Sequence, residues 1–200
     1  MQYIHDALIV ALIGYIIGSI PFGLLITRFA GLGDIRAIGS GNIGATNVLR
    51  TGRKFLAVTT LFLDVMKGFF PVYVLKLCGF EGFLLYASGI ATVIGHIFPI
   101  WLKFKGGKGV STSVGAIAGV NPVVGVFAFG VWVFVFIITK TASLASIFAA
   151  FAVALFAFIW KISLGIYVTI LSLIVIARHR QNIQRLLRGE ELAFKSKEEA

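Results

Sequence analysis

Residues 110–139 read VSTSVGAIAGVNPVVGVFAFGVWVFVFIIT, an apolar run with Asn121-Pro122 near its middle. Proline has no amide proton and disfavours helix at the residue before it, so we expect the run to break there. We predict a short helix near 110–120 and a membrane span near 122–138. The short helix would rise only about 16 Å, roughly half the hydrocarbon core. It must therefore extend past Pro122, or its end must lie in a dip buried in protein.

Further apolar runs lie on both sides of this break. Hydrophobic residues make up 58% of the chain and charged residues only 13%, which is more apolar surface than a soluble domain can hide. A span needs about 20 mostly apolar residues, and the other candidate runs are 1–29, 55–77, 83–102, 142–160 and 162–177. The predicted fold class is all-α: a polytopic membrane protein with seven transmembrane helices. We predict a single membrane-embedded domain over residues 1–200, with a cytosolic tail at 178–200.

The basic residues support seven helices, because this count places most of them on one face of the membrane. They are Arg28, Arg36, Arg50, Arg53 and Lys54 after the first helix, Lys103, Lys105 and Lys108 after the third, Lys140, and Arg178, Arg180, Arg185 and Arg188 in the tail. This face must be cytosolic by the positive-inside rule, so the N-terminus is predicted outside and the C-terminus in the cytosol. The net charge of +10 then indicates this bias, anionic headgroups or an anionic substrate, and not nucleic acid.

The first polar loop carries the segment GSGNIGATN at residues 39–47, followed by Arg50. Its glycines let the backbone turn tightly and direct amides at an oxyanion. Neutral donors surround them, and Arg50 adds a guanidinium fork for phosphate or carboxylate. The alternative is a flexible linker made of small turn residues. The candidate residues here are Ser40, Gly41, Asn42, Gly44, Asn47 and Arg50.

The second polar loop reads KGGKGVST at residues 105–112. It is not a Walker A loop, because residue 102 is leucine where that motif requires glycine. Bare backbone, two ammonium groups and hydroxyls at the start of a helix still favour anion binding. The alternative is a basic anchor with a glycine hinge. The candidate residues are Lys105, Gly106, Gly107, Lys108, Gly109 and Ser111.

The third polar segment begins at His179 and includes Arg180 and Asn182. A histidine can accept or donate a proton and can bind phosphate. Asn182 is three residues further on, so on a helix it shares a face with His179. The alternative is an arginine-rich end of a membrane helix with an incidental histidine. Three anion-suited segments on one face together favour a pocket for phosphorylated ligands.

Asp64 and Lys67 are charged residues inside the second predicted span. Charges within a membrane are functional candidates by default. Their i, i+3 spacing also permits a mutual salt bridge, and we favour this structural interpretation.

Two common catalytic arrangements are missing from the sequence. The cytosolic face has no carboxylate pair with metal-ligand spacing, so we expect no metal and no other cofactor. The H-x-x-x-x-D dyad of many glycerolipid acyltransferases is also missing, because Gln184 follows His179 and Trp101 follows His96 at the required spacing.

The three segments, together with GSIPFG at residues 18–23, resemble the bacterial acyl-phosphate:glycerol-3-phosphate acyltransferase (PlsY) family over nearly the whole chain. Ile43 departs from the family pattern, where proline is more usual. The resemblance implies transfer of a fatty acyl group from acyl phosphate to the 1-hydroxyl of glycerol 3-phosphate. The products would be lysophosphatidic acid and inorganic phosphate, in the first step of phospholipid synthesis. The site would lie at the cytosolic face of the bacterial inner membrane.

The resemblance also implies residue roles and partners. Ser40, Arg50, His179 and Asn182 would serve catalysis, residues 106–109 would bind glycerol 3-phosphate, and Glu190 would be structural. A soluble phosphate acyltransferase would supply the acyl phosphate, and membrane lipid surrounds the chain. A transporter of an organic phosphate or lipid is the alternative function. It would need polar groups near the midplane and gates on both sides, whereas polarity here is concentrated on one face.

Overall fold

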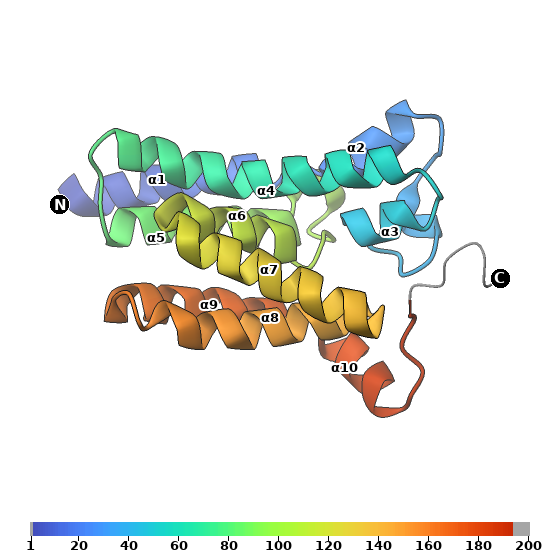
Figure 1. Cartoon of the computed structure of the whole chain (residues 1–200). Helices are drawn as coiled ribbons and strands as arrows, with labels where there is room; N and C mark the ends of the chain where they lie inside the picture. The colour runs from blue at the N-terminus through green and yellow to red at the C-terminus, as the bar shows by residue number, and fades with distance from the viewer. Residues whose placement is uncertain (1, 194–200) are drawn as a thin grey trace. The chain divides into compact units, whose positions relative to one another are not determined.

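The computed structural model describes residues 2–193, which are helical and contain no β-strand. The elements are α1 (Gln2–Gly18), α2 (Phe22–Phe29), η1 (Ile35–Ala37), α3 (Ala45–Leu49), α4 (Lys54–Leu77), α5 (Phe83–Ile97), η2 (Ile100–Leu102), α6 (Val110–Val120), α7 (Pro122–Thr139), α8 (Ala142–Ala157), α9 (Ile162–Arg178) and α10 (Arg180–Leu187) (Figure 1). The predicted all-α class is confirmed, as is the break at Asn121-Pro122 between α6 and α7. Residues 194–200 of the predicted cytosolic tail lie outside the described residues.

By length and composition, fewer helices qualify as membrane spans than the seven that the sequence predicted. Among the described residues, four helical segments are long and apolar enough to cross a membrane: Tyr3–Phe29, Lys54–Leu77, Phe83–Leu102 and Pro122–Thr139. The pair α9 and α10, bent by 61°, adds a fifth if it is counted as one span. Helices α6 and α8 are apolar but shorter. The seven-helix count therefore stays a prediction.

The chain divides into two compact units, Met1–Pro122 and Val123–Ala200. Whether they act as the single predicted domain also stays a prediction. In the first unit, small residues let helix backbones touch. A Cβ atom at Gly18 would overlap the backbone of Thr92 on α5, and one at Gly95 would overlap the backbone of Tyr15 on α1. Such close approach is how helices associate where no hydrophobic driving force exists between them.

Helix α6 packs in parallel with the second half of α4. Gly68 on α4 lies against the carbonyl of Thr112, and Gly115 lies against the carbonyl of Val65. The first turn of α6 is therefore level with the middle of α4, about 15 Å along that helix. At the C-terminal end of α6, Lys76 Nζ from α4 donates to the carbonyl oxygen of Val120 over 2.9 Å. The start of α6 is thus recessed relative to the start of α4, as the predicted dip requires. The alternative, extension of this helix past Pro122, is wrong, because α6 ends at Val120.

The first polar loop is anchored by a small apolar core, which excludes the flexible linker. This core consists of Leu24, Ile35, Ile43, Val48 and Ala57. Ile43, which departs from the family pattern, is 3% exposed and holds the loop to α2 and α4. The departure from proline thus has a packing role.

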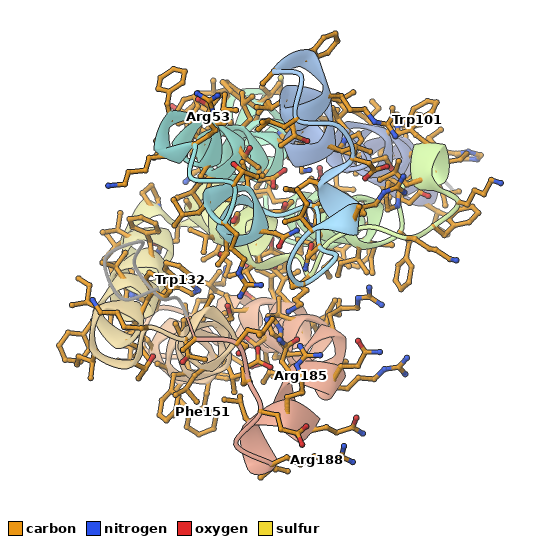
Figure 2. All side chains as sticks on the ribbon, turned by 90° about the vertical axis from the view of Figure 1, so that its right-hand side faces the viewer. Arg53, Trp101, Trp132, Phe151, Arg185 and Arg188 are labelled. Atoms are coloured by element: carbon orange, nitrogen blue, oxygen red, sulfur yellow. The ribbon has the colours of Figure 1, made fainter. Side chains whose placement is uncertain are left out.

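The second unit is built on α7, α8 and α9, with α10 at the end of α9 (Figure 1). Hydrogen bonds from a hydroxyl and an indole group connect α9 and α7 to α8. Ser172 donates to the carbonyl oxygen of Ala150 over 2.8 Å, and Trp132 donates to Ser146 Oγ over 3.0 Å. Phe151 is exposed on the outer side of α8, as expected for a face in contact with lipid (Figure 2).

Candidate active site

Asn47 organises the first polar loop with its side-chain amide. Its Oδ1 accepts from the Ser40 backbone amide over 3.0 Å, and the Ser40 hydroxyl lies 3.3 Å away. Its Nδ2 faces the carbonyl oxygens of Ile35, Ile38 and Asn42 at 3.0, 3.0 and 2.8 Å. Asn47 is 2% exposed, so the side chain shapes the loop from within. Its predicted contact with phosphate stays a prediction.

The loop brings Ser40 and Arg50 to the same place. Gly39 has a φ of 57°, which favours glycine. A Cβ atom at this position would lie 2.9 Å from Arg50 Cδ and 3.2 Å from its guanidinium nitrogen. Glycine at position 39 therefore leaves room for the Arg50 side chain. The neighbouring residue, Ser40, is exposed. The guanidinium thus lies against residue 39, the neighbour of Ser40, and a hydroxyl and a guanidinium from one loop are donors suited to a phosphate group.

The three other predicted residues of this loop, Gly41, Asn42 and Gly44, contribute to its turns. Gly41 has a φ of 69°, another conformation that glycine adopts readily. The backbone amide of Gly44 donates to Asn42 Oδ1 over 3.2 Å, just before α3 begins at Ala45. Helix α3 thus begins directly after this turn.

The second polar loop lies at the recessed start of α6, and two of its glycines have a structural role in addition to the predicted one. The amides of Gly106 and Gly107 donate over 3.0 Å to the carbonyls of Ile97 and His96. These two amides therefore close the loop onto the end of α5. The prediction that glycine is needed here for approach to phosphate is incomplete, because a Cβ atom at Gly107 would overlap the His96 ring.

The amides that follow are better placed to receive an anion. Gly109 precedes α6 with a φ of 86° and makes no side-chain cap bond. The first amides of a helix lack intrahelical partners and carry the positive end of its dipole. Lys105 is exposed and Lys108 is half-buried on the same loop. Ser111 is half-buried in the first turn, consistent with the predicted cradle.

The candidate residues of this loop included Ser111 but not the next two hydroxyls, although Thr112 belongs to the quoted motif. Thr112 Oγ1 and Ser113 Oγ are buried without a hydrogen-bond partner at the start of α6. Buried hydroxyls usually have a partner. The sequence feature that indicates these two hydroxyls is the run of three hydroxyl residues at 111–113.

In the second unit, His179 lies at the bend between α9 and α10. It is 2% exposed, and its Nδ1 lies 2.8 Å from the carbonyl oxygen of Val175. A carbonyl oxygen can only accept, so Nδ1 carries a proton. In the neutral imidazole the lone pair then lies on Nε2. Arg180, the next residue, is exposed at the start of α10.

Asn182 lies in the first turn of α10 and is held by Glu191. Its Nδ2 donates to Glu191 Oε1 over 2.6 Å, and Ser143 Oγ donates to the same oxygen over 2.8 Å. Arg185 Nε donates to Glu191 Oε2 over 2.7 Å. Arg185 extends from α10, as Figure 2 shows. The carboxylate thus ties α10 to α8 and fixes the orientation of the Asn182 amide.

This structural carboxylate corrects the assignment made from the resemblance, which named Glu190. Helix α10 ends at Leu187, and Gly189 has a φ of 70°. The amide of Glu190 donates to the carbonyl of Arg185, which turns the chain back across the helix end. Glu190 is exposed as a result, and the residue that returns to the helix is Glu191.

Replacing Glu191 with glutamine is expected to lower the unfolding free energy by about 1–3 kcal/mol, a few degrees of melting temperature. Burial raises the pKa of the Glu191 carboxyl, but hydrogen bonds from Asn182, Arg185 and Ser143 outweigh this effect and hold the pKa below its usual value. Its stabilisation is therefore present above the unfolded-state pKa and is lost as pH falls through the lower folded-state pKa.

Melting temperature in detergent against pH measures this effect. The gap between the wild type and Glu191→Gln should be widest near neutral pH and should narrow in acid. Glu190→Gln, at the exposed neighbour, serves as the control and should follow the wild type. A gap that does not depend on pH would contradict the role of the carboxylate.

The predicted residues therefore form two groups. Ser40, Arg50 and both glycine-rich loops belong to the first unit, and His179 and Asn182 belong to the second. Asp64 and Lys67, also in the first unit, form the predicted salt bridge at 2.6 Å.

Comparison with known proteins places all three segments in one family. The family model for glycerol-3-phosphate acyltransferase matches residues 8–189. The glycerol-3-phosphate acyltransferase of Erythrobacter litoralis (strain HTCC2594) is 50% identical over 194 residues, covering 96% of each chain. That of Wolbachia pipientis wMel is 44% identical over 187 residues, covering 93% of this chain and 97% of the relative.

Solved structures give the same result. The glycerol 3-phosphate form of PlsY (YgiH), an integral membrane glycerol 3-phosphate acyltransferase, superimposes with a TM-score of 0.89 at 40% identity, covering 96% of this chain and 97% of that one. Its lysophosphatidic acid form gives a TM-score of 0.86 at 40% identity, covering 94% and 95%. This chain is an integral membrane protein that belongs to the glycerol-3-phosphate acyltransferase family.

Proposed function

We propose that this chain transfers a fatty acyl group from acyl phosphate to the 1-hydroxyl of glycerol 3-phosphate. The products are lysophosphatidic acid and inorganic phosphate. The observation that carries the proposal is the second polar loop, residues 105–109, which lies before the uncapped and recessed start of α6. A phosphate bound there sits level with the middle of α4, where an acyl chain in the bilayer can reach it.

Each substrate has a separate set of donors. Lys105, Lys108 and the amides at the start of α6 bind the phosphate of glycerol 3-phosphate. Ser40 and Arg50 bind the phosphate of the acyl donor and stabilise its charge as it leaves. A soluble phosphate acyltransferase supplies this donor, as the family resemblance implies.

Acyl phosphate is already activated, so the protein needs mainly to position the reactants and stabilise charge. The 1-hydroxyl oxygen attacks the acyl carbon, and the bond from that carbon to the phosphate oxygen breaks as the ester forms. The hydroxyl proton passes to the leaving phosphate. Before attack the hydroxyl donates a hydrogen bond to His179 Nε2, which directs its oxygen at the acyl carbon, and the proton turns to the phosphate oxygen as the ester bond forms. Asn182 and Arg180 assist from the first turn of α10.

An assay in detergent separates this function from transport, because detergent leaves no second compartment. Purified protein with palmitoyl phosphate and glycerol 3-phosphate should produce lysophosphatidic acid and inorganic phosphate in equal amounts, identified by mass spectrometry. Omitting glycerol 3-phosphate should stop both. Binding of both compounds without turnover would overturn the enzymatic proposal. Family membership favours the enzyme over the transporter.

We further propose that the chain crosses the bacterial inner membrane seven times, with its active site at the cytosolic face. The short helices α6 and α8 are then counted as spans. The distribution of lysine and arginine between the two faces supports this arrangement. It places the N-terminus and residue 78 outside and residues 178–200 in the cytosol.

Cysteine labelling tests the topology. Cys78 is the single cysteine of the chain and is exposed. We expect a membrane-impermeant maleimide to label it in spheroplasts. Glu190→Cys in a Cys78→Ser background should react only after the membrane is permeabilised. Labelling of both positions from the same side would rule out the seven-helix arrangement.

A further inference from the structure

A buried polar cluster lies beneath the second polar loop and has no role in the proposed mechanism. Asp64, Lys67 and His96 are 2%, 4% and 5% exposed. Lys67 Nζ lies 2.6 Å from Asp64 Oδ1, and His96 Nδ1 lies 3.8 Å from the same oxygen. A buried ion pair often stabilises no more than well-packed apolar side chains would. Its presence within a span therefore points to a function.

One end of this cluster meets the break between α1 and α2. Lys67 Nζ donates over 2.8 Å to the carbonyl oxygen of Ile20, the residue before Pro21. It also lies 5.5 Å from the centre of the Phe22 ring. A helix break inside a membrane leaves carbonyl groups that need a donor, and Lys67 supplies one. The lysine is thereby fixed, and Asp64 with it.

The other end meets the second polar loop. His96 lies one residue before the end of α5, and its carbonyl accepts from the Gly107 amide over 3.0 Å. A Cβ atom at Gly107 would overlap His96 Nε2 and lie 2.8 Å from Cε1. The Nε2–Cε1 edge of the imidazole therefore packs directly against Gly107. The opposite ring nitrogen, Nδ1, faces Asp64.

We infer that His96 is a positioning residue for glycerol 3-phosphate. It supports the loop at Gly107 in the conformation that presents the following amides and lysines to phosphate. The Asp64 carboxylate faces the imidazole across 3.8 Å, and Lys67 links Asp64 to the break at Ile20. This inference rests on the proposed function, because it takes the loop as the glycerol 3-phosphate site. Groups that orient binding residues typically contribute about 10–100-fold.

A double-mutant cycle tests the inference on four proteins: the wild type, Gly107→Ala, His96→Ala and the double variant. Each single change should raise both KM and Kd for glycerol 3-phosphate by about 10–100-fold, with kcat changed by less than about threefold. In the double variant the new methyl group occupies space that the imidazole has vacated. We expect its KM and Kd to match those of His96→Ala and not the product of the two effects.

If His96→Ala folds poorly, two conservative variants at the same position still test the inference. His96→Gln can place its amide near the position of Nε2, so it should keep Kd within about threefold of the wild type. His96→Asn can place its amide only near Nδ1, toward Asp64, so it should raise Kd as alanine does. Gly130→Ala is the control, since a Cβ atom there meets open space, and it should leave KM and Kd unchanged.

The two proposals can fail separately. Independent effects of His96 and Gly107 in an active enzyme would overturn this inference and leave the proposed function standing. So would a loss in His96→Ala that is confined to kcat. Absence of acyl transfer by the wild type would overturn the proposed function, while Kd from titration calorimetry with glycerol 3-phosphate would still decide the role of His96.

Discussion

Replacing His179 with alanine is expected to lower kcat by about 10²–10⁴-fold, because in the proposed mechanism this residue orients the attacking hydroxyl. The side chain is buried, and the hydrogen bond from Nδ1 to the Val175 carbonyl fixes the ring. The loss should therefore come from chemistry at Nε2. Initial rates with both substrates saturating measure it, and circular dichroism checks that the variant is folded.

Two isosteric variants divide the roles of the two ring nitrogens. Asparagine can replace the Nδ1 donor to Val175 but has nothing at Nε2. Glutamine can place a hydrogen-bonding group near Nε2 but cannot take up a proton. Since the leaving phosphate takes the proton in the proposed mechanism, His179→Gln should retain at least about a tenth of kcat, and His179→Asn should be as slow as alanine. A glutamine variant as inactive as alanine would show that His179 is itself the base.

Replacing Asn47 with aspartate is expected to lower kcat/KM by about 10²-fold or more. The change preserves shape but turns donors into acceptors opposite three carbonyl oxygens. At about 1 kcal/mol for each lost contact, the loop conformation loses about 3 kcal/mol, which corresponds to about 10²-fold. Ser40 and Arg50 would then lose their common orientation. Steady-state rates with acyl phosphate varied measure the effect.

Asn42→Asp is the matched control for this variant. It adds the same negative charge to the same loop, but its oxygen still accepts from the Gly44 amide. Both variants should weaken binding of an anionic substrate through their charge. The additional loss in Asn47→Asp measures its hydrogen bonds to the loop carbonyls. Equal losses would show that charge alone is responsible and that Asn47 does not hold the loop.

Most of the helices and the break at Asn121-Pro122 could be predicted because their causes are local, whereas the break between α1 and α2 at Ile20-Pro21 lay inside the predicted span 1–29 and was missed. The break at Asn121-Pro122 follows from the missing amide proton of proline, and apolar runs of sufficient length set the other limits. The three polar segments could likewise be identified, because glycines, hydroxyls and basic residues occur densely in each. These features need no knowledge of which helices pack together.

The contacts between distant residues could not be predicted in the same way. The left-handed turn at Gly189 decides which glutamate holds Asn182. It returns the Glu191 carboxylate to α10 and leaves Glu190 exposed. That Gly107 rests on His96 depends on how α5 ends beside α6. In both cases the sequence supplied the residue types, and the packing decided their roles.

The fate of the bridging oxygen in acyl phosphate tests the proposed acyl transfer most directly. Palmitoyl phosphate labelled with oxygen-18 between carbon and phosphorus is turned over with glycerol 3-phosphate in detergent, and the products are analysed by mass spectrometry. Attack on the acyl carbon leaves the label entirely in inorganic phosphate, in an amount equal to the unlabelled lysophosphatidic acid. Label in free palmitate, with a second phosphate on glycerol, would mean attack at phosphorus and would contradict acyl transfer.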